Sequence, residues 1–110
     1  GEAVALPVAV YEAAEGSQAH NHHIYNQFVI RVAQRDALRD FLTRSGVGCE
    51  VYYPLCLHQQ ECLHPYGFSG QGFPEAERAA QESLALPIYP ELTPDQLEYV
   101  VATIARFFKS

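Results

Sequence analysis

Apolar residues recur along the first half of the chain with periods that change from segment to segment. In residues 23–32, HIYNQFVIRV, alternate side chains would face opposite sides of an extended chain. Both sides carry apolar side chains, which predicts a central strand. Residues 35–45 place apolar side chains on one face of a helix. Gly46 follows as the expected C′ residue of that helix. Residues 47–53 alternate again and predict a second strand.

The middle of the chain is poor in periodic apolar residues. Residues 54–74 are rich in glycine and proline and predict a long loop, with a helical turn at 57–63. Loops of this length inside compact domains are usually functional. Pro74 suits the first turn of a helix that continues through residues 75–83.

The last third of the chain has the clearest signals. Residues 85–89 predict a short third strand. Thr93, Pro94 and Gln96 suit the N-cap, N1 and N3 positions of a final helix, as a capping box. Helices that flank such short strands predict an α+β fold in two layers. We expect a small antiparallel or mixed sheet of about three strands, with the helices packed on one face.

Length and composition indicate one globular domain. The 110 residues are 48% hydrophobic and contain no run of 18 apolar residues, so we expect no membrane span. Three cysteines in a chain of this size suit a reducing compartment, which predicts a cytoplasmic protein. We expect residues 1–19 to form an irregular lead-in segment and residues 20–110 to form the domain. The histidines near residue 20 are interpreted as part of a polar loop, with a titrating or metal-binding cluster as the alternative.

The charge distribution argues against nucleic-acid binding. The net charge is −6, and the arginines are scattered, whereas phosphate recognition needs a basic face. Arg35, Arg39 and Arg44 fall near one side of the predicted helix, but Asp36 and Asp40 lie among them. We therefore interpret this side as a solvated helix face.

One short stretch has the residue types of a zinc site. Cys56, His58, Cys62 and His64 follow each other as C-x-H-x3-C-x-H. Structural zinc sites usually space their ligand pairs as C-x2–4-C and H-x3–5-H, and a helical turn would separate the two cysteines. Zinc is therefore the weaker interpretation. No P-loop, G-x-G-x-x-G or G-x-S-x-G motif occurs either.

Several motifs, taken in order, resemble a known family. These are the strand HHIYNQFVIRV, the segment RDALRDFLTRSGVGCEVYYPLCLHQQ and the segment FPEAERAAQESLALPIYPELTPDQLEYVV. Over residues 20–108 they resemble the C-terminal small domain of the DegT/DnrJ/EryC1/StrS aminotransferases. These are fold-type I enzymes that use pyridoxal phosphate to transfer an amino group from glutamate to nucleotide-linked keto-sugars. The resemblance implies a homodimer when the protein is full length.

The resemblance also implies substrate-binding residues. Tyr52, Tyr53 and His58 match the family's H-Y-P-x-P-x-H-x-Q loop at the mouth of the active site, although position 52 is commonly histidine in the family. Tyrosine offers an aromatic face and a hydroxyl to a sugar. His58 can donate a hydrogen bond to a hydroxyl or a phosphate. Asn26 is a weaker candidate from the aromatic–polar strand.

Catalysis by this chain alone is not expected. Pyridoxal chemistry needs a lysine amine to hold the cofactor, and the sole lysine is Lys109, next to the C-terminus. We therefore expect no cofactor on this chain and place the cofactor lysine in a separate large domain. Two alternatives stay open. One is a domain of a related sugar dehydratase, and the other is a free-standing α+β module that binds or responds to a small molecule.

Overall fold

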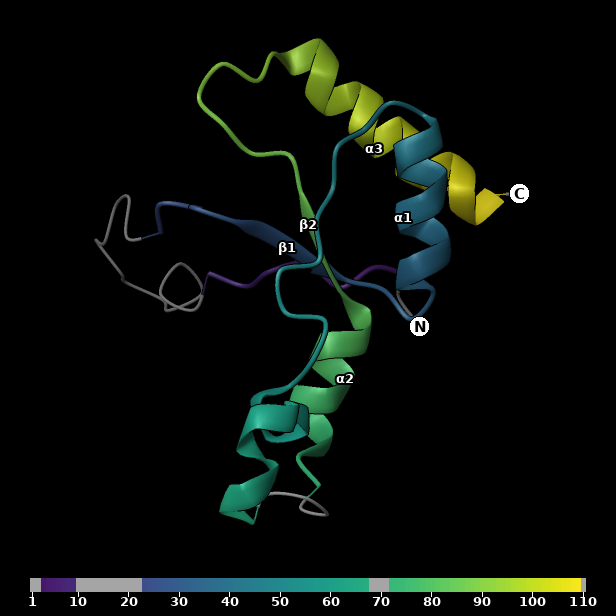
Figure 1. Cartoon of the computed structure of the whole chain (residues 1–110). Helices are drawn as coiled ribbons and strands as arrows, with labels where there is room; N and C mark the ends of the chain where they lie inside the picture. Colours follow the sequence, from purple (N-terminus) through teal and green to yellow (C-terminus); the bar gives the residue numbers. More distant parts are fainter. Residues whose placement is uncertain (1–2, 10–22, 68–71, 110) are drawn as a thin grey trace.

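The computed structural model describes residues 3–9, 23–67 and 72–109. Its elements follow in the order β1 (Phe28–Arg31), α1 (Arg35–Arg44), η1 (Leu57–Gln59), η2 (Glu61–Tyr66), α2 (Pro74–Glu82), β2 (Ser83–Leu86) and α3 (Pro94–Lys109). The elements η1 and η2 are short 3-10 helices. The two strands cross the middle of the molecule, with α1 and α3 beside each other and α2 leading directly into β2 (Figure 1).

The sheet is antiparallel and consists of β1 and β2. Val29 pairs with Ala85, and Ile30 pairs with Leu84. A single bridge extends each edge, because Ala5 pairs with Arg31 and Glu50 pairs with Ala85. Ala5 belongs to the predicted lead-in segment 1–19, of which residues 1–2 and 10–19 lie outside the described part of the chain.

The α+β class is confirmed, but the prediction of about three strands was wrong, because the described residues form two. Tyr25 has a φ of 45°, which interrupts the extended backbone before Phe28 and shortens the predicted strand 23–32. The predicted strand 47–53 reaches the sheet at Glu50 alone, where two backbone bonds of 2.8 and 3.0 Å join it to Ala85.

The hydrophobic core lies between one face of the sheet and two helices. Ile30 of β1 and Leu84 of β2 are almost fully buried with Leu38 and Leu42 of α1. Val100, Ile104 and Phe107 of α3 pack against this cluster. Because side chains alternate along a strand, the opposite face of the sheet carries Gln27, Val29, Ser83 and Ala85. That opposite face forms the floor of the site described below.

The predicted helix ends are confirmed. Gly46 has a φ of 76°, its N–H donates to the carbonyl of Thr43, and Val47 N–H donates to the carbonyl of Leu42, as in a Schellman motif. At the start of α3, the backbone N–H of Thr93 donates to Gln96 Oε1 at 2.9 Å. The backbone N–H of Gln96 donates to Thr93 Oγ1 at 3.3 Å, which completes the capping box.

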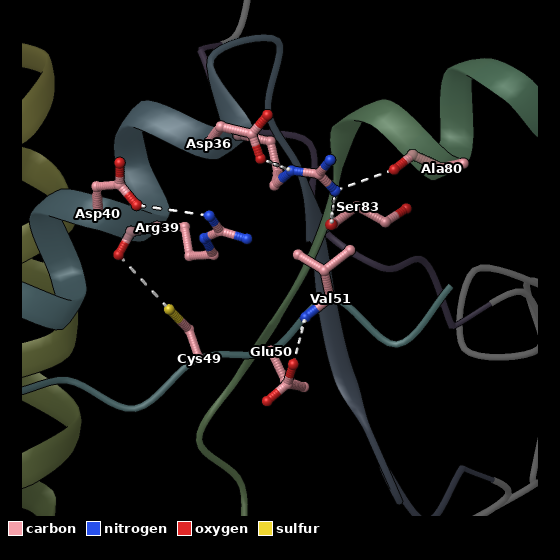
Figure 2. A network of polar contacts seen from close by, with 9 residues as sticks. Asp36, Arg39, Asp40, Cys49, Glu50, Val51, Ala80 and Ser83 are labelled. Carbon is pink, nitrogen blue, oxygen red and sulfur yellow. Dashed lines mark hydrogen bonds and ion pairs between the residues drawn. The ribbon is translucent and has the colours of Figure 1, made fainter. Parts of the chain in front are cut away.

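Arg35 departs from the predicted solvated helix face, because it is buried while Arg39 and Arg44 are exposed. Its Nη1 donates to the carbonyl oxygens of Ala80 and Ser83, both at 3.0 Å. Its Nε donates to Asp36 Oδ1 at 2.7 Å. Ala80 and Ser83 lie at the end of α2 and the start of β2 (Figure 2). The guanidinium therefore joins the first turn of α1 to the junction of α2 and β2.

The molecule is open for its length. Its radius of gyration is 16.9 Å, whereas a compact 110-residue domain has about 13 Å. The chain exposes 8386 Å², compared with about 6,100 Å² for a compact monomer of this mass. Several large apolar side chains contribute, including Leu57, Tyr66 and Val101. Within the described ranges, none of the helices is long and apolar enough to cross a membrane.

Candidate functional site

A hollow lies on the face of the sheet opposite the core, between α2 and the segment that follows Glu50. We call it the loop hollow, and its volume is about 880 Å³. Val29 of β1 and Ala85 of β2 contribute to its floor. Its walls include Ala76, Ala79 and Ala80 of α2 and Tyr52, Tyr53, Leu55, Cys56, Leu57 and His58 of the loop. Such a largely apolar hollow with a few polar side chains is typical of a small-molecule site.

The two predicted tyrosines stand where the chain leaves the sheet. Glu50 is held at the edge of β2 by its bridge with Ala85, and the residues after it are unpaired with a strand. Tyr52 is 52% exposed and Tyr53 is 79% exposed. Their rings and hydroxyls are therefore accessible at the surface instead of packed in the core.

His58 lies a few residues after the two tyrosines, in η1, and contacts α2. Its Nε2 is 2.8 Å from Glu77 Oε1, and its ring centroid is 4.8 Å from that of Phe73. The His58 side chain is 10% exposed. The structure thus gives one ring nitrogen of His58 a protein partner, and the residue lines the loop hollow.

Glu77 accepts a second hydrogen bond in the same place. The backbone N–H of Phe73 donates to Glu77 Oε1 at 3.1 Å. The hydrogen bonds from Phe73 N–H and from His58 hold the pKa of the Glu77 carboxyl below its usual range. Glu77 is therefore an anion at neutral pH, near the N-terminus of α2, where negative charge is favoured.

Asn26 lies in a different hollow from Tyr53 and His58. This α3 hollow, of about 750 Å³, is lined by Asn26, Gly48, Tyr89, Asp95 and Tyr99, with Tyr52 at its border with the loop hollow. Asn26 itself is exposed. The structure therefore brings Tyr52, Tyr53 and His58 together at the loop hollow, whereas Asn26 shares a hollow with Tyr52 alone of these three.

The geometry of the C-x-H-x3-C-x-H stretch does not assemble a metal site. In the part of the chain that the structure describes, no three His, Cys, Asp or Glu side chains form a group that could hold a metal ion. Cys62 Sγ lies 3.9 Å from Gln60 Oε1, and the Nε2 atom of His58 contacts Glu77 instead of a cysteine. Cys49 lies outside this stretch, and its thiol points toward the backbone carbonyl of Arg39 (Figure 2). Burial raises the pKa of the Cys49 thiol, which keeps it protonated.

Sequence reasoning missed the contribution of α2. Ala76, Ala79 and Ala80 are spaced i, i+3 and i+4, which places them on one face of the helix, and that face lines the hollow. Their small side chains leave room beside the tyrosines. The spacing was visible in the sequence, whereas the contact between Glu77 and His58 spans 19 positions and had no local signal.

The residues present do not fit the anchoring of pyridoxal phosphate. Lys109 is exposed in the last turn of α3, and neither the loop hollow nor the α3 hollow is lined by a lysine. A covalently held pyridoxal cofactor needs a lysine amine beside the substrate. The described hollows can thus contact a substrate but cannot fix this cofactor.

Comparisons with known proteins agree on one family. The sequence profile of the DegT/DnrJ/EryC1/StrS aminotransferase family matches residues 6–105. A pleiotropic regulatory protein of Geobacillus stearothermophilus is 44% identical over 88 residues, which cover 80% of this chain and 24% of that protein. A UDP-N-acetyl-3-dehydro-alpha-D-glucosamine 3-aminotransferase of Acidithiobacillus ferrooxidans is 34% identical over 104 residues, which cover 94% of this chain and 26% of the relative.

Solved structures support the fold. The structure of S. venezuelae DesV in complex with a ketimine intermediate aligns with a TM-score of 0.81 and 24% identity, over 99% of this chain and 27% of that one. A family aminotransferase from Brucella abortus aligns with a TM-score of 0.68 and 27% identity, over 76% of this chain and 22% of that one. NtdA from Bacillus subtilis, solved with bound cofactor PMP, aligns with a TM-score of 0.74 and 23% identity over 98% of this chain and 23% of that one.

The chain spans about a quarter of the length of the curated relatives it matches. Pyridoxal phosphate is the cofactor of the family, which agrees with the PMP bound to the NtdA structure. With a profile match over residues 6–105, the chain belongs to the DegT/DnrJ/EryC1/StrS aminotransferase family.

Proposed function

We propose that this chain is the C-terminal small domain of a pyridoxal phosphate-dependent aminotransferase that transfers an amino group from glutamate to a nucleotide-linked keto-sugar. The family match over residues 6–105 is the observation that carries the proposal. Two relatives named as transaminases of nucleotide-linked sugars support the substrate class. A fold alone does not define an activity, so the proposed substrate contacts rest on the residues of the loop hollow.

In this proposal the chain contributes substrate contacts and no catalytic group. Tyr53 and Tyr52 present hydroxyls and rings to the sugar, and the alanine face of α2 forms an apolar surface beside the substrate. His58 fixes one polar group of the substrate, and Asn26 contacts a part that reaches the α3 hollow. The cofactor, when bound, supplies the electron sink for the amino transfer, and its lysine lies outside this chain. The chain is therefore inactive alone.

The surroundings of the domain follow from the same proposal. Exposed apolar residues such as Leu57 and Val101 would be covered by the large domain and by the partner subunit of a homodimer. The three cysteines are free thiols, which suits a cytoplasmic protein. The net charge of −6 argues against nucleic acid as a partner.

Two other functions are separated from this one by a single assay. A related sugar dehydratase would share the same small domain. A regulatory module is favoured by one observation, since relatives at 44% and 36% identity carry the names pleiotropic regulatory protein and sensory transduction protein EryC1.

The test uses the natural protein that carries this chain, supplied with pyridoxal phosphate, L-glutamate and a panel of UDP- and dTDP-linked keto-sugars. The proposal predicts 2-oxoglutarate formation that depends on one of the keto-sugars. Sugar turnover without glutamate consumption would instead identify the dehydratase. Sugar binding without turnover of either substrate would identify a regulatory module.

A further inference from the structure

We infer that Glu77 is a positioning residue, which holds the neutral form of His58 with Nε2 as the donor and thereby leaves Nδ1 as a hydrogen-bond acceptor for the ligand. The group that His58 recognises is then a donor, such as a sugar hydroxyl, and not a phosphate oxygen. The inference rests on the proposed function for the identity of the ligand, but not for the contact between the two side chains.

The contact is fixed from three directions. The Nε2–Oε1 distance of 2.8 Å joins His58 to Glu77, and Phe73 N–H donates to the same oxygen at 3.1 Å. The ring of Phe73 lies 4.8 Å from that of His58 at an interplanar angle of 53°. A ring that is hydrogen-bonded, packed against another ring and 10% exposed has little freedom to turn over.

The protonation of this contact follows from the carboxylate. An ionised carboxylate accepts hydrogen bonds and donates none, so the proton of the contact must lie on Nε2 of His58. The lowered pKa of Glu77 keeps the carboxylate ionised at neutral pH. In a neutral imidazole, a proton on Nε2 leaves Nδ1 as the acceptor.

The consequence is a choice between ligand groups. The loop hollow is lined by His58, and among the described residues no partner is found for its Nδ1. A hydroxyl or amine of the ligand can donate to that atom. A phosphate or carboxylate oxygen would face Nδ1 as a second acceptor, which is unfavourable. This repulsion would help to exclude ligand orientations that place such an oxygen beside His58. This inference replaces our first expectation, which was that His58 donates to a hydroxyl or a phosphate.

The first test measures the tautomer directly. Long-range ¹H–¹⁵N spectra of the full 110-residue chain, recorded with neutral His58, should show a protonated Nε2 and an unprotonated Nδ1. The resonances can be assigned with a His58→Gln variant. Glu77→Gln keeps an acceptor oxygen and should retain this pattern, whereas Glu77→Ala should make the form protonated on Nδ1 detectable. Glu75→Ala is the matched control, since Glu75 is an exposed glutamate in the same turn of α2 and pairs with Arg78.

The second test measures the effect on the ligand, in the natural protein that carries this chain. Glu77→Ala should raise the KM for the keto-sugar about tenfold with a smaller change in kcat, which corresponds to about 1.4 kcal/mol. Glu77→Gln should restore KM to within about twofold, and Glu75→Ala should leave it unchanged.

The two tests fail separately. A wild-type ring protonated on Nδ1, or a tautomer that Glu77→Ala leaves unchanged, would overturn the positioning role. An unchanged KM in Glu77→Ala would overturn the recognition of a donor group. The expected tautomer in a protein without aminotransferase activity would support the positioning role and overturn the proposed function alone.

Discussion

Arg35 connects two helices from a buried position. Its guanidinium donates to the carbonyl oxygens of Ala80 and Ser83, where α2 ends and β2 begins. Because β2 contributes to the floor of the loop hollow and α2 forms its wall, this side chain is bonded to the junction between them. The residue therefore acts on the site through backbone geometry, without facing a ligand.

Replacing Arg35 by methionine keeps much of the aliphatic stem but removes all donors. Arg35→Met should lower the free energy of unfolding of the chain by about 2 kcal/mol, because two carbonyl oxygens lose their partner. Urea denaturation measures the change. Arg39→Met is the control, since Arg39 forms an exposed pair with Asp40, and it should alter stability by less than about 0.5 kcal/mol. Equal effects of the two substitutions would contradict the role of Arg35.

Glu77 makes stability depend on pH in a defined direction. Its pKa is lowered in the folded chain, so its contribution is fully present above the ordinary glutamate pKa of about 4.3 and is lost as pH falls through the folded value. The urea midpoint of the wild-type chain should therefore fall in that acidic range more steeply than the midpoint of Glu77→Gln. Parallel curves for the two proteins would show that Glu77 titrates alike in the folded and unfolded chain.

At the scale of elements, the end of α1 depends on one glycine. Gly46 has a φ of 76°, and a Cβ at this position would meet nothing within 4 Å, so backbone conformation alone opposes a side chain. Gly46→Ala should destabilise the chain by about 1 kcal/mol in thermal or urea unfolding.

Gly48 is the matched control for Gly46. It has equally open space around a Cβ, but its φ lies outside the left-handed region. Gly48→Ala should be neutral or stabilise the chain by up to about 1 kcal/mol, because the unfolded chain loses freedom. Destabilisation of similar size at both glycines would contradict the explanation from φ.

The elements that could be predicted from sequence are those whose signals are local. The capping box of Thr93 and Gln96 and the glycine after α1 place helix ends within one residue, because each motif satisfies its own backbone groups. Strand ends were less accurate. The pairing of Glu50 depends on Ala85, far along the chain, whereas Tyr25, with its φ of 45°, contacts nearby His23 and Phe28 among the described residues.

The candidate site was predictable only where its residues lie close together in the sequence. Tyr52, Tyr53 and His58 come from one loop and do gather at one hollow. The partner of His58 and the buried state of Arg35 depend on contacts across 19 and 45 positions, respectively, which periodicity does not encode. The hollow that Asn26 lines could not be predicted either, because a position in a predicted strand does not reveal which hollow its side chain borders.

At the scale of the whole molecule, the exposed surface is the main feature. The chain exposes 8386 Å² and has a radius of gyration of 16.9 Å, both larger than expected for a compact domain of this length. Apolar side chains from α3 and the loop contribute to that surface, including Val101, Leu57 and Tyr66. A large exposed apolar area is typical of a surface that another protein or domain covers.

The isolated chain should therefore bind an apolar dye such as ANS and associate as its concentration rises. Sedimentation and dye fluorescence measure the two properties. A monodisperse monomer without dye binding would contradict the small-domain proposal and favour the free-standing module.

The most direct measurement compares two exposed tyrosines of the same segment in the natural protein that carries this chain. Tyr53 lines the loop hollow and is 79% exposed, whereas Tyr66 is 73% exposed and does not line it. With glutamate saturating, Tyr53→Ala should lower kcat/KM for the keto-sugar about tenfold, the effect of losing about 1.4 kcal/mol of contact. Tyr66→Ala should leave it within about twofold. Equal values for both variants and the wild type would show that the loop hollow is not where the sugar binds.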